Sequence, residues 1–383
     1  MKMDFSTYQR GVVVLAAGGT GGHLFPAQAL AEALVARGVL VHLMTDARGV
    51  EFGNRFPAVA VHEIPSATIT LRKPWRVPGQ LYKLVTGFMA ARRLMADMQP
   101  EPPIAIVGFG GYPSLPPLLA ALHLKIPSII HEQNAIMGRA NRAVAKYTSA
   151  VASSFPKIAN LPALKGEFAF TGNPVRSIVM KQWDAPYAAP EADQTFRILI
   201  FGGSQGAHFF SEVMPRVIEA LPLAVRRHLK IVQQVRAEDI KEVQDHYDRI
   251  GADVKLAPFF ADLPKLIALS HLVICRSGAS TIAELAIVGR PAIMVPLPHA
   301  IDNDQLKNAQ SFSTAGAGWL MQQKDTSHEE MAAFITRMRF QPEELTQAAN
   351  AAKAFARPDA AELLANLVQK HATTKVVSEK VEE

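Results

Sequence analysis

The chain has 383 residues, about twice the usual length of one domain, which favours two domains that each bury a core of their own. With 49% hydrophobic residues and no long low-complexity tract, the composition excludes a largely disordered protein, and a net charge of +6 favours anionic partners. A single cysteine, Cys275, excludes a disulfide framework within the chain and a cysteine metal site, as is usual in a reducing compartment.

The N-terminal sequence MKMDFSTYQR lacks the apolar core of a signal peptide. No apolar run approaches the length that a bilayer span requires. We therefore expect a cytoplasmic or peripheral protein, and the distribution of charge has to decide whether its anionic partner is a nucleic acid, a phospholipid or a phosphorylated metabolite.

The first half of the chain alternates short apolar runs with helical patterns. A strand over residues 11–17 leads into the glycine-rich sequence GGTGGH (18–23), and a helix follows, with Pro26 expected in its first turn and Gly38 at its end. Continuous apolar strands separated by helices predict a parallel sheet with helices on both faces. Further strands are predicted over residues 39–46, 104–109, 127–132 and 149–154.

A second cycle of the same kind opens at Phe196, where a strand runs into GGSQGA (202–207). Both halves thus share the order strand, two glycines, hydroxyl residue, glycine and helix. We predict an α/β fold of two Rossmann-like, doubly wound parallel-sheet domains that face each other across a ligand-binding cleft. The later strands are predicted over residues 230–235, 253–259, 271–275 and 292–297.

The predicted domain boundaries follow the change in composition around the proline- and alanine-rich segment 183–193. We expect the polar residues after about Lys370 to fray. The predicted parts are an N-terminal domain over 1–180, a linker over 181–195, a C-terminal domain over 196–357, and a C-terminal helix over 358–383 that packs back on the N-terminal domain.

Both glycine loops suit an anion, because glycine lets a ligand approach the backbone and the start of a helix presents unpaired N–H groups. The first loop lacks the third glycine of the dinucleotide fingerprint, although Asp46 could bind a ribose. The sequence G-x-x-x-x-G-K-[ST] of a P-loop is also missing. An NAD-binding oxidoreductase and a P-loop nucleotidase are therefore disfavoured. A structural role, as tight turns that let helices pack on strands, stays open.

The stretch from Cys275 to Ala309 reads as a strand, a glycine turn, a short helix that ends at Gly289, a strand, and a loop rich in carboxylates and amides. Thr281 and Glu284 match a capping box, in which the glutamate bonds back to the helix start. In the alternative interpretation, Glu284 accepts hydrogen bonds from a ribose diol. The local spacing does not separate the two.

Seven segments together resemble one family. They are GGTGGH, GFGGYPS (108–114), HEQNAIMGRAN (131–141), GNPVR (172–176), GGSQGA, CRSGASTIAEL (275–285) and HAIDNDQLKNA (299–309). In order and approximate spacing they resemble the bacterial undecaprenyldiphospho-muramoylpentapeptide β-N-acetylglucosaminyltransferases, two-domain peptidoglycan enzymes of the GT-B fold. The resemblance extends from about residue 11 to about residue 320, and the combination of HEQN with GGSQGA and RSGAST is specific.

This resemblance implies an inverting transfer of N-acetylglucosamine from UDP-N-acetylglucosamine to the C4 hydroxyl of the muramoyl residue, which converts lipid I to lipid II. No cofactor and no metal ion are expected. The donor is expected mainly on the C-terminal domain. The residues that the resemblance implies for substrate binding are Thr20, Gly21, Gly22, Tyr112, Asn134, Arg176, Ser204, Phe260, Ala279, Ser280, Thr281, Glu284 and Gln305.

Within the implied donor site, Ser204 would meet the diphosphate, Phe260 and residues 279–281 the uridine and phosphate, and Glu284 the ribose. Gln305 and Asn134 would contact the sugar, and Arg176 would lie near the nucleotide. The chain has Asp304 where many members of the family carry an amide or a histidine, and whether Asp304 reaches the sugar stays open.

The displacement needs a base for the attacking hydroxyl and stabilisation of the leaving diphosphate. His23 is the first candidate base, because an imidazole titrates near neutral pH. Orientation of the acceptor or helix capping is its alternative role. Glu132 is the second candidate base, and a structural role in supporting the loop of Asn134 competes with it.

The segment 71–95 holds six basic residues and no acid, interleaved with apolar side chains. Beside a lipid-linked acceptor, this pattern favours contact with an anionic membrane surface over nucleic-acid binding. In a third interpretation, Tyr82, Val85 and Met89 are core contacts of an ordinary helix. The predicted membrane contacts are Arg72, Lys73, Trp75, Arg76, Lys83 and Phe88.

Other functions remain as alternatives. A related GT-B enzyme that acts on another acceptor is the nearest one, because nucleotide-sugar epimerases and glycolipid transferases share the fold. An NAD-binding oxidoreductase is disfavoured by its missing third glycine. A catalytically silent membrane-binding protein is disfavoured by the intact set of Ser204, Glu284, Asn134 and His23.

Overall fold

The structure is a computed structural model that describes residues 11–52, 56–68, 74–98, 102–191, 193–298 and 301–379. The chain folds into two compact units. Unit 1 consists of residues 1–176 together with residues 357–383, and unit 2 consists of residues 177–356. The last segment of the chain therefore belongs to the same unit as the first.

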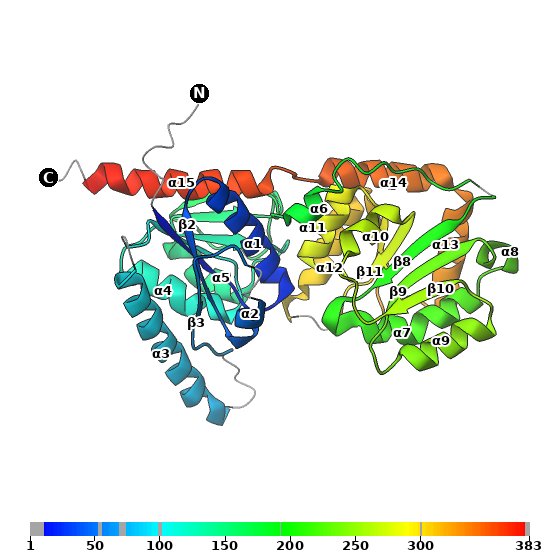
Figure 1. Ribbon diagram of the computed structural model, residues 1–383, viewed down its shortest axis with the longest axis horizontal. Helices are drawn as coiled ribbons and strands as arrows, with labels where there is room; N and C mark the ends of the chain where they lie inside the picture. The colour runs from blue at the N-terminus through cyan, green and yellow to red at the C-terminus, as the bar shows by residue number, and fades with distance from the viewer. Residues whose placement is uncertain are drawn as a thin grey trace. The chain divides into compact units, whose positions relative to one another are not determined.

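In the described part of unit 1, seven parallel strands form one sheet in the order β3-β2-β1-β4-β5-β6-β7. Its strands β2 and β3 are labelled in Figure 1. The central strands are buried on both faces, as continuous apolar runs require. The strands are β1 (Val12–Ala16), β2 (Leu40–Thr45), β3 (Ala60–Glu63), β4 (Ala105–Gly108), β5 (Ser128–Glu132), β6 (Ala150–Ser153) and β7 (Glu167–Phe170).

Two hydrophobic clusters lie on opposite faces of this sheet, because successive strand side chains alternate between the faces. Val13 and Leu15 pack with the first and last long helices, α1 and α15, whereas Val12 and Val14 pack with α3, α4 and α5. The helices are α1 (Gly21–Ala36), α2 (Ala47–Phe52), α3 (Val77–Ala96), α4 (Leu115–His123), α5 (Arg139–Val144) and α15 (Ala360–Glu379), with 3₁₀ turns η3 (Pro74–Arg76), η4 (Tyr112–Ser114) and η5 (Ala145–Tyr147).

In the described part of unit 2, six parallel strands have the order β10-β9-β8-β11-β12-β13. One face of this sheet packs against α7, α9 and α13. The strands are β8 (Phe196–Phe201), β9 (Leu229–Gln234), β10 (Val254–Ala257), β11 (Leu272–Cys275), β12 (Ala292–Met294) and β13 (Gly318–Leu320).

The helices of unit 2 connect these strands, as expected for a doubly wound sheet. They are α6 (Ser177–Met180), α7 (Gly203–Glu219), α8 (Leu223–Arg226), α9 (Ile240–Arg249), α10 (Leu263–Leu269), α11 (Ala279–Val288), α12 (Asp304–Thr314), α13 (His328–Phe340) and α14 (Pro342–Phe355), with the 3₁₀ turn η6 (Ile301–Asn303).

The predicted fold class, two doubly wound parallel-sheet domains, is confirmed. Each strand predicted from the sequence is present, but β3, β7 and β13 are not predicted. All three lie at sheet edges, where side chains are half-exposed and no continuous apolar run is needed. Apolar runs therefore identify the strands at the centre of a sheet more readily than those at its edges.

The end of α1 agrees with the sequence, but its start does not. Gly38 has a φ of 78° and donates its N–H to the carbonyl of Val35, which closes the helix as predicted. Pro26 was expected in the first turn, yet the helix starts at Gly21 and Pro26 lies inside it. The missing N–H of Pro26 affects the carbonyl of Gly22, an exposed residue where water can replace the lost partner.

Candidate functional site

Each sheet has a point at which the strand order reverses, between β1 and β4 in unit 1 and between β8 and β11 in unit 2. Doubly wound sheets bind ligands beyond the carboxyl ends of the strands at this point. In unit 1 the loops that follow these strands are GGTGGH and the glycines of GFGGYPS. In unit 2 they are the start of GGSQGA and the RSGAST segment. The motifs selected from the sequence thus lie at both reversal points.

The first loop ends in the N-terminus of a 16-residue helix, α1. Thr20 is the N-cap in extended backbone, and its exposed side chain makes no capping hydrogen bond among the described residues. The carbonyl of Thr20 accepts the N–H groups of His23 and Leu24. Gly21 and Gly22 occupy the first two helical positions, whose N–H groups have no partner within a helix. This end of α1 therefore suits an anion.

The imidazole of His23 lies against the second glycine loop of unit 1. Gly110 and Gly111 have φ values of +83° and +74°, a conformation that other residues rarely adopt. A Cβ atom added to Gly111 would lie 3.3 Å from Cδ2 of His23, so the glycines leave room for the ring. On its other side, Nδ1 of His23 lies 3.2 Å from Oε1 of Gln133. The ring is half-buried and held at the start of α1.

Glu132, the second candidate base, is occupied by the loop that follows it. Its Oε1 accepts the backbone N–H of Asn134 at 3.1 Å and the side-chain amide of Asn134 at 3.3 Å. Its Oε2 accepts the N–H of Gly138 at 3.0 Å and the amide of Asn141 at 2.9 Å. Burial raises the pKa of this carboxyl, against the effect of these hydrogen bonds. The contacts favour the role of supporting the Asn134 loop over that of a base.

Three other predicted residues of unit 1 lie near the same end of the sheet. Tyr112 follows Gly111 directly in the chain and is half-buried. Asn134 is held by Glu132, two residues after the strand end. The guanidinium of Arg176 lies over the ring of Phe25, with its Cζ 3.8 Å from the ring centroid. Because Phe25 is two residues after His23, this contact brings Arg176 to the start of α1.

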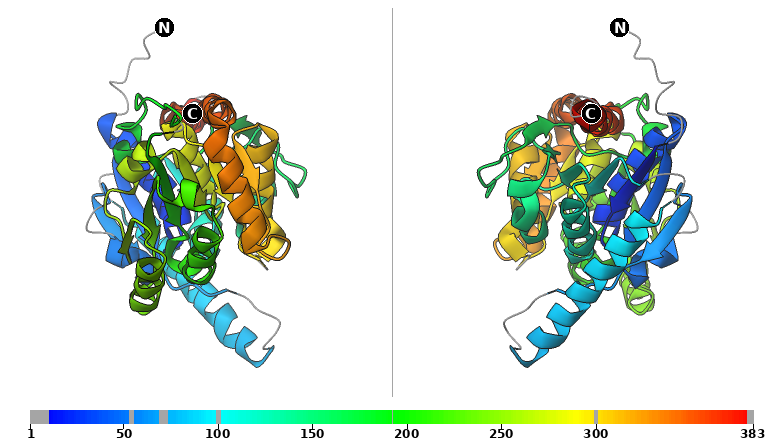
Figure 2. Two further views of the ribbon diagram at one scale, coloured as in Figure 1. Left: turned by 90° about the vertical axis from the view of Figure 1, so that its right-hand side faces the viewer. Right: turned by 90° about the vertical axis from the view of Figure 1, so that its left-hand side faces the viewer.

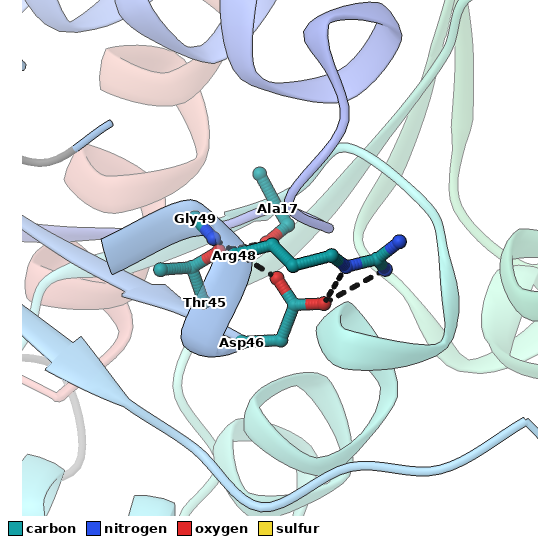
Figure 3. Close-up of polar contacts among 5 residues, drawn as sticks. All are labelled: Ala17, Thr45, Asp46, Arg48 and Gly49. Carbon is teal, nitrogen blue, oxygen red and sulfur yellow. Dashed lines mark hydrogen bonds and ion pairs between the residues drawn. The ribbon is translucent and has the colours of Figure 1, made fainter. Parts of the chain in front are cut away.

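Asp46, which the dinucleotide interpretation assigned to a ribose, is engaged within its own turn (Figure 3). Its Oδ2 accepts Nε and Nη2 of Arg48 at 3.1 and 2.9 Å, and its Oδ1 accepts the N–H of Gly49 at 3.2 Å. Thr45 donates its hydroxyl to the carbonyl of Ala17 at 2.8 Å, which ties this turn to the end of β1. These contacts hold α2 beside the first glycine loop.

In unit 2, the capping-box interpretation of Thr281 and Glu284, one of the two left open by the sequence, is wrong. Helix α11 starts at Ala279 with Gly278 as its N-cap, so Thr281 is the third helical residue and makes no cap. The glycine turn already gives the backbone its entry into the helix, which moves the start three residues earlier than a threonine cap would. Glu284 is 7% exposed in the second turn of α11. The hydroxyl oxygen of Ser280 is buried and has no hydrogen-bond partner among the described residues.

Gln305 is joined to the same turn. Its carbonyl accepts the hydroxyl of Ser277 at 2.8 Å, and its Oε1 accepts the N–H of Leu297 at 2.9 Å. Because Oε1 is used in this way, Nε2 is the group with which Gln305 would recognise a ligand oxygen. Asp304 accepts the backbone N–H of Gln305 at 2.8 Å, which fixes the first turn of α12. Gln305 and the start of α11 are thus brought together.

Two further residues predicted for the nucleotide-sugar site, Phe260 and Ser204, are located by the strands that they follow. Phe260 follows β10 and is half-buried beside the exposed Phe259. Ser204 lies in the first turn of α7, after Gly203 with its φ of 65°, and its side chain lies outside the described residues. Because β8, β10 and β11 are parallel, all three loops lie at the carboxyl edge of one sheet.

The predicted membrane segment forms helix α3, which extends from the rest of unit 1 (Figure 2, light blue). Tyr82, Val85 and Met89 are 70%, 50% and 61% exposed, so their interpretation as ordinary core contacts is wrong. Trp75, a predicted membrane contact, is 72% exposed. Arg76 and Lys83 are exposed beside them, and Arg72 and Lys73 lie outside the described residues.

Phe88 differs from the other predicted membrane contacts. It is half-buried, packs against the core cluster under α3 and meets the ring of His123 edge-on at 5.8 Å. The helical period turns Phe88 inward while Val85 and Met89 face outward. In the part of the chain that the structure describes, no helix is long and apolar enough to cross a bilayer.

Three buried polar residues that the sequence did not single out lie in the same segments as the predicted site residues. Gln133 contacts His23, and Asn141 donates to Glu132. Asn173 is 8% exposed, and neither atom of its amide group has a hydrogen-bond partner among the described residues. All three residues lie in the segments HEQNAIMGRAN and GNPVR that carry the family resemblance. The motif sequences alone do not say which of their polar side chains are buried or which residues they contact.

Comparison with known families matches both units. The model of the glycosyltransferase family 28 N-terminal domain matches residues 13–153, and that of the glycosyltransferase family 28 C-terminal domain matches residues 197–364. A protein of Mesorhizobium japonicum is 48% identical over 371 residues, which cover 97% of this chain and 98% of that protein. A protein of Rhizobium meliloti is 47% identical over 96% of this chain and 98% of its own length. Both are named UDP-N-acetylglucosamine–N-acetylmuramyl-(pentapeptide) pyrophosphoryl-undecaprenol N-acetylglucosamine transferase.

Solved structures agree with these matches. The crystal structure of Acinetobacter baumannii MurG has a TM-score of 0.75 at 30% identity and covers 94% of this chain and 99% of its own. A UDP-GlcNAc 2-epimerase from Neisseria meningitidis has a TM-score of 0.64 at 15% identity over 94% of this chain and all of its own, a likeness of fold alone.

Proposed function

Since the chain belongs to the family of UDP-N-acetylglucosamine–N-acetylmuramyl-(pentapeptide) pyrophosphoryl-undecaprenol N-acetylglucosamine transferases, we propose a division of the reaction between its two units. The chain is an inverting glycosyltransferase that moves N-acetylglucosamine from UDP-N-acetylglucosamine to the C4 hydroxyl of lipid I, giving lipid II in peptidoglycan synthesis. Unit 2 holds the donor, and unit 1 holds the acceptor and the base.

The donor site is built on the start of α11. The N-terminus of this ten-residue helix attracts the diphosphate, and the buried hydroxyl of Ser280 offers a hydrogen bond to it. Ala279 and Thr281 flank that hydroxyl in the first turn, and Ser204 meets the diphosphate from α7. Glu284 accepts hydrogen bonds from the ribose hydroxyls one turn further along α11.

The uracil and the sugar of the donor are recognised by residues at the same sheet edge. Phe260 offers an aromatic face on which uracil stacks. Gln305 donates Nε2 to a sugar oxygen, since its Oε1 already accepts the N–H of Leu297. Asn134 contacts the sugar from unit 1, on a loop that the carboxylate of Glu132 holds in place.

The acceptor binds at the start of α1. Thr20, Gly21 and Gly22 present a hydroxyl and unpaired N–H groups to the diphosphate of the lipid carrier. His23 and Tyr112 lie beside that anion site, and Arg176, held on Phe25, adds a positive charge for the leaving diphosphate.

His23 acts as the base. Its imidazole takes the proton of the C4 hydroxyl while the oxygen forms a bond to the anomeric carbon of the donor. The bond from that carbon to the diphosphate oxygen breaks on the opposite side, and UDP leaves with the electron pair, so configuration is inverted. This assignment depends on the position of His23. It lies in the first turn of α1, at the helix N-terminus that suits an anion, and α1 follows β1 at the strand-order reversal of unit 1.

The test uses labelled UDP-N-acetylglucosamine and a short-chain lipid I analogue. The full chain should transfer sugar, and His23→Ala should lower kcat by roughly 10²-fold or more with the KM of the donor little changed. His228→Ala, at an exposed histidine before β9, serves as the control. A His23→Ala variant that loses donor binding but keeps kcat would contradict the role of base.

Helix α3 places unit 1 on the cytoplasmic face of the membrane that anchors the acceptor. Its exposed aromatic and apolar side chains enter the region of the lipid head groups, and Arg76 and Lys83 meet anionic lipid, together with Arg72 and Lys73 before the helix. Trp75 is the largest of the exposed aromatic groups.

A pelleting assay with phosphatidylglycerol vesicles tests this surface. Tyr82→Ser and Lys83→Ala should each reduce binding severalfold, and neutral vesicles should bind less protein. Tyr147→Ser is a matched control, because Tyr147 is 61% exposed on another element of unit 1. Equal binding by Tyr82→Ser and Tyr147→Ser would remove α3 as the contact surface.

A further inference from the structure

A continuous chain of hydrogen bonds leads from His23 into the interior of unit 1. It passes from His23 to Gln133, from Gln133 to His131, and from His131 to the carbonyl of Gly172. His131 and Gln133 are 0% and 1% exposed. Because water does not reach these two side chains, their donors and acceptors have to be matched within the protein.

The inner end of the chain fixes the state of His131. Its Nε2 lies 2.9 Å from the carbonyl oxygen of Gly172, which can only accept, so Nε2 carries a hydrogen. Burial lowers the pKa of His131 to about 4, so the ring is neutral at physiological pH. Its other nitrogen, Nδ1, then has a lone pair and is an acceptor.

The state of His131 fixes the orientation of the Gln133 amide. One amide atom of Gln133 lies 2.9 Å from the carbonyl oxygen of His131 and 3.0 Å from its Nδ1, and both of these are acceptors. That atom must be the nitrogen Nε2, which uses one hydrogen for each acceptor. The reversed amide would place an oxygen against two acceptors, so Oε1 faces His23.

The orientation of Gln133 in turn fixes the proton on His23. Oε1 of Gln133 carries no hydrogen and lies 3.2 Å from Nδ1 of His23, so Nδ1 must be the donor. A neutral imidazole with its hydrogen on Nδ1 keeps a lone pair on Nε2, which is the requirement for a base. Because Gln133 is uncharged, it orients the ring without the electrostatic attraction that a carboxylate would exert on the protonated form.

We propose that Gln133 is a positioning residue that holds His23 in the tautomer with the hydrogen on Nδ1, so that Nε2 is the atom that takes the acceptor's proton. This inference rests on the proposed role of His23 as the base. His131 and the carbonyl of Gly172 act behind Gln133 and set the direction of its amide.

The first test measures the tautomer directly in the full chain labelled with ¹⁵N-histidine. Nuclear magnetic resonance distinguishes the two ring nitrogens, and His23→Gln identifies the signals of His23 among the 12 histidines. In its neutral form the ring is expected to carry its hydrogen on Nδ1. A ring with hydrogen on Nε2 would overturn the inference, whatever the activity of any variant. This outcome does not depend on whether His23 is the base.

The second test replaces the amide. Gln133→Met keeps the length of the side chain but offers no acceptor, so the Nδ1 tautomer should lose population and kcat should fall by roughly 10- to 100-fold, with the donor KM within about twofold. Gln133→Glu keeps an acceptor for Nδ1 and, with the carboxyl protonated on its inner oxygen, a donor for His131, so it should retain that tautomer. Gln28→Met, at a half-buried position of α1 where Gln28 pairs with Glu32, is the control.

The outcomes separate the two proposals. If His23→Ala keeps its turnover while the tautomer shifts in Gln133→Met, the role of base fails and the positioning by Gln133 stands. A Gln133→Met variant with the tautomer and kcat of the parent would reduce Gln133 to a space-filling residue. If Gln133→Met does not fold, Gln133→Glu must still show the Nδ1 tautomer.

Discussion

Nη1 of Arg37 donates a hydrogen bond of 2.6 Å to Oε1 of Gln369, a residue 332 positions later in the chain. Arg37 caps the C-terminus of α1, and Gln369 lies on α15. Nη2 of Arg37 also pairs with the carboxylate of Glu362 and donates to its carbonyl. Both helices pack into the same hydrophobic cluster, side by side on one face of the unit 1 sheet (Figure 1).

We expect Arg37→Ala to destabilise the docking of α15. The change removes hydrogen bonds to a charged donor that is largely covered, and should cost about 1–2 kcal/mol of the free energy of unfolding, measured in urea. Arg93→Ala is the matched control, because its pair with Asp97 is exposed and should contribute almost nothing. Equal effects of the two substitutions would show that the Arg37 contacts do not hold α15.

A second prediction concerns Glu132. In Glu132→Gln the amide NH₂ must face either the donors of Asn134 or those of Gly138 and Asn141, so two donor groups meet. We expect a loss of about 1–3 kcal/mol in the free energy of unfolding, and lower turnover because the loop shifts. Glu63→Gln, at an exposed residue of β3, should leave stability unchanged. Full stability of Glu132→Gln with a large loss of kcat would instead restore Glu132 as a candidate base.

A third prediction concerns Gly19, in the loop that precedes α1. An added Cβ would lie 2.6 Å from the N of Gly49 and 2.7 Å from Cβ of Arg48, and would also overlap the carboxylate of Asp46. Gly19→Ala should therefore displace α2 or the glycine loop and lower the unfolding free energy by about 1–3 kcal/mol. At Gly22 the nearest atom is 4.0 Å away, so Gly22→Ala should keep full stability. Calorimetry of the two variants compares them, and equal transition temperatures would contradict the close packing.

The fourth prediction concerns pH. His42 and His62 stack with ring centroids 5.3 Å apart, and burial lowers the pKa of both. The folded state therefore binds protons less readily than the unfolded chain, so the contribution of the pair to stability is present above about pH 6.5 and is lost as pH falls through the folded pKa values. The urea midpoint should drop between pH 7.5 and 5.5, and it should drop less in the double variant His42→Gln/His62→Gln. The same drop in both proteins would exclude the pair as its source.

The sequence predicts which loops follow the buried strands at the strand-order reversals better than it predicts what each side chain contacts there. Glycine loops after buried strands are a local pattern, so GGTGGH and the RSGAST segment could be located without a structure. The roles of Glu132 and Gln133 depend on partners up to 110 residues away, such as His23. Glu132 and Gln133 are adjacent in one motif, but Glu132 supports the following loop and Gln133 contacts the imidazole of His23. The spacing of residues within the motif does not predict this difference.

The misplaced capping box illustrates the same limit. Thr281 and Glu284 have the right spacing, but Gly278 is already the N-cap, and this shifts every residue of the helix relative to the pattern. Short motifs are sensitive to such shifts because a helix start moves by one or two residues with the geometry of the preceding turn. The long-range fold is less sensitive, since it depends on whole apolar strands.

The return of α15 to unit 1 also has a consequence for synthesis on the ribosome. Leu364, Ala365, Leu367 and Val368 complete a core cluster whose other members lie between Val13 and Ala152. The N-terminal part of unit 1 thus leaves the ribosome before unit 2 but keeps part of its apolar surface uncovered until α15 is translated, whereas unit 2 is continuous in the chain. The unit that is made first is the last to be finished.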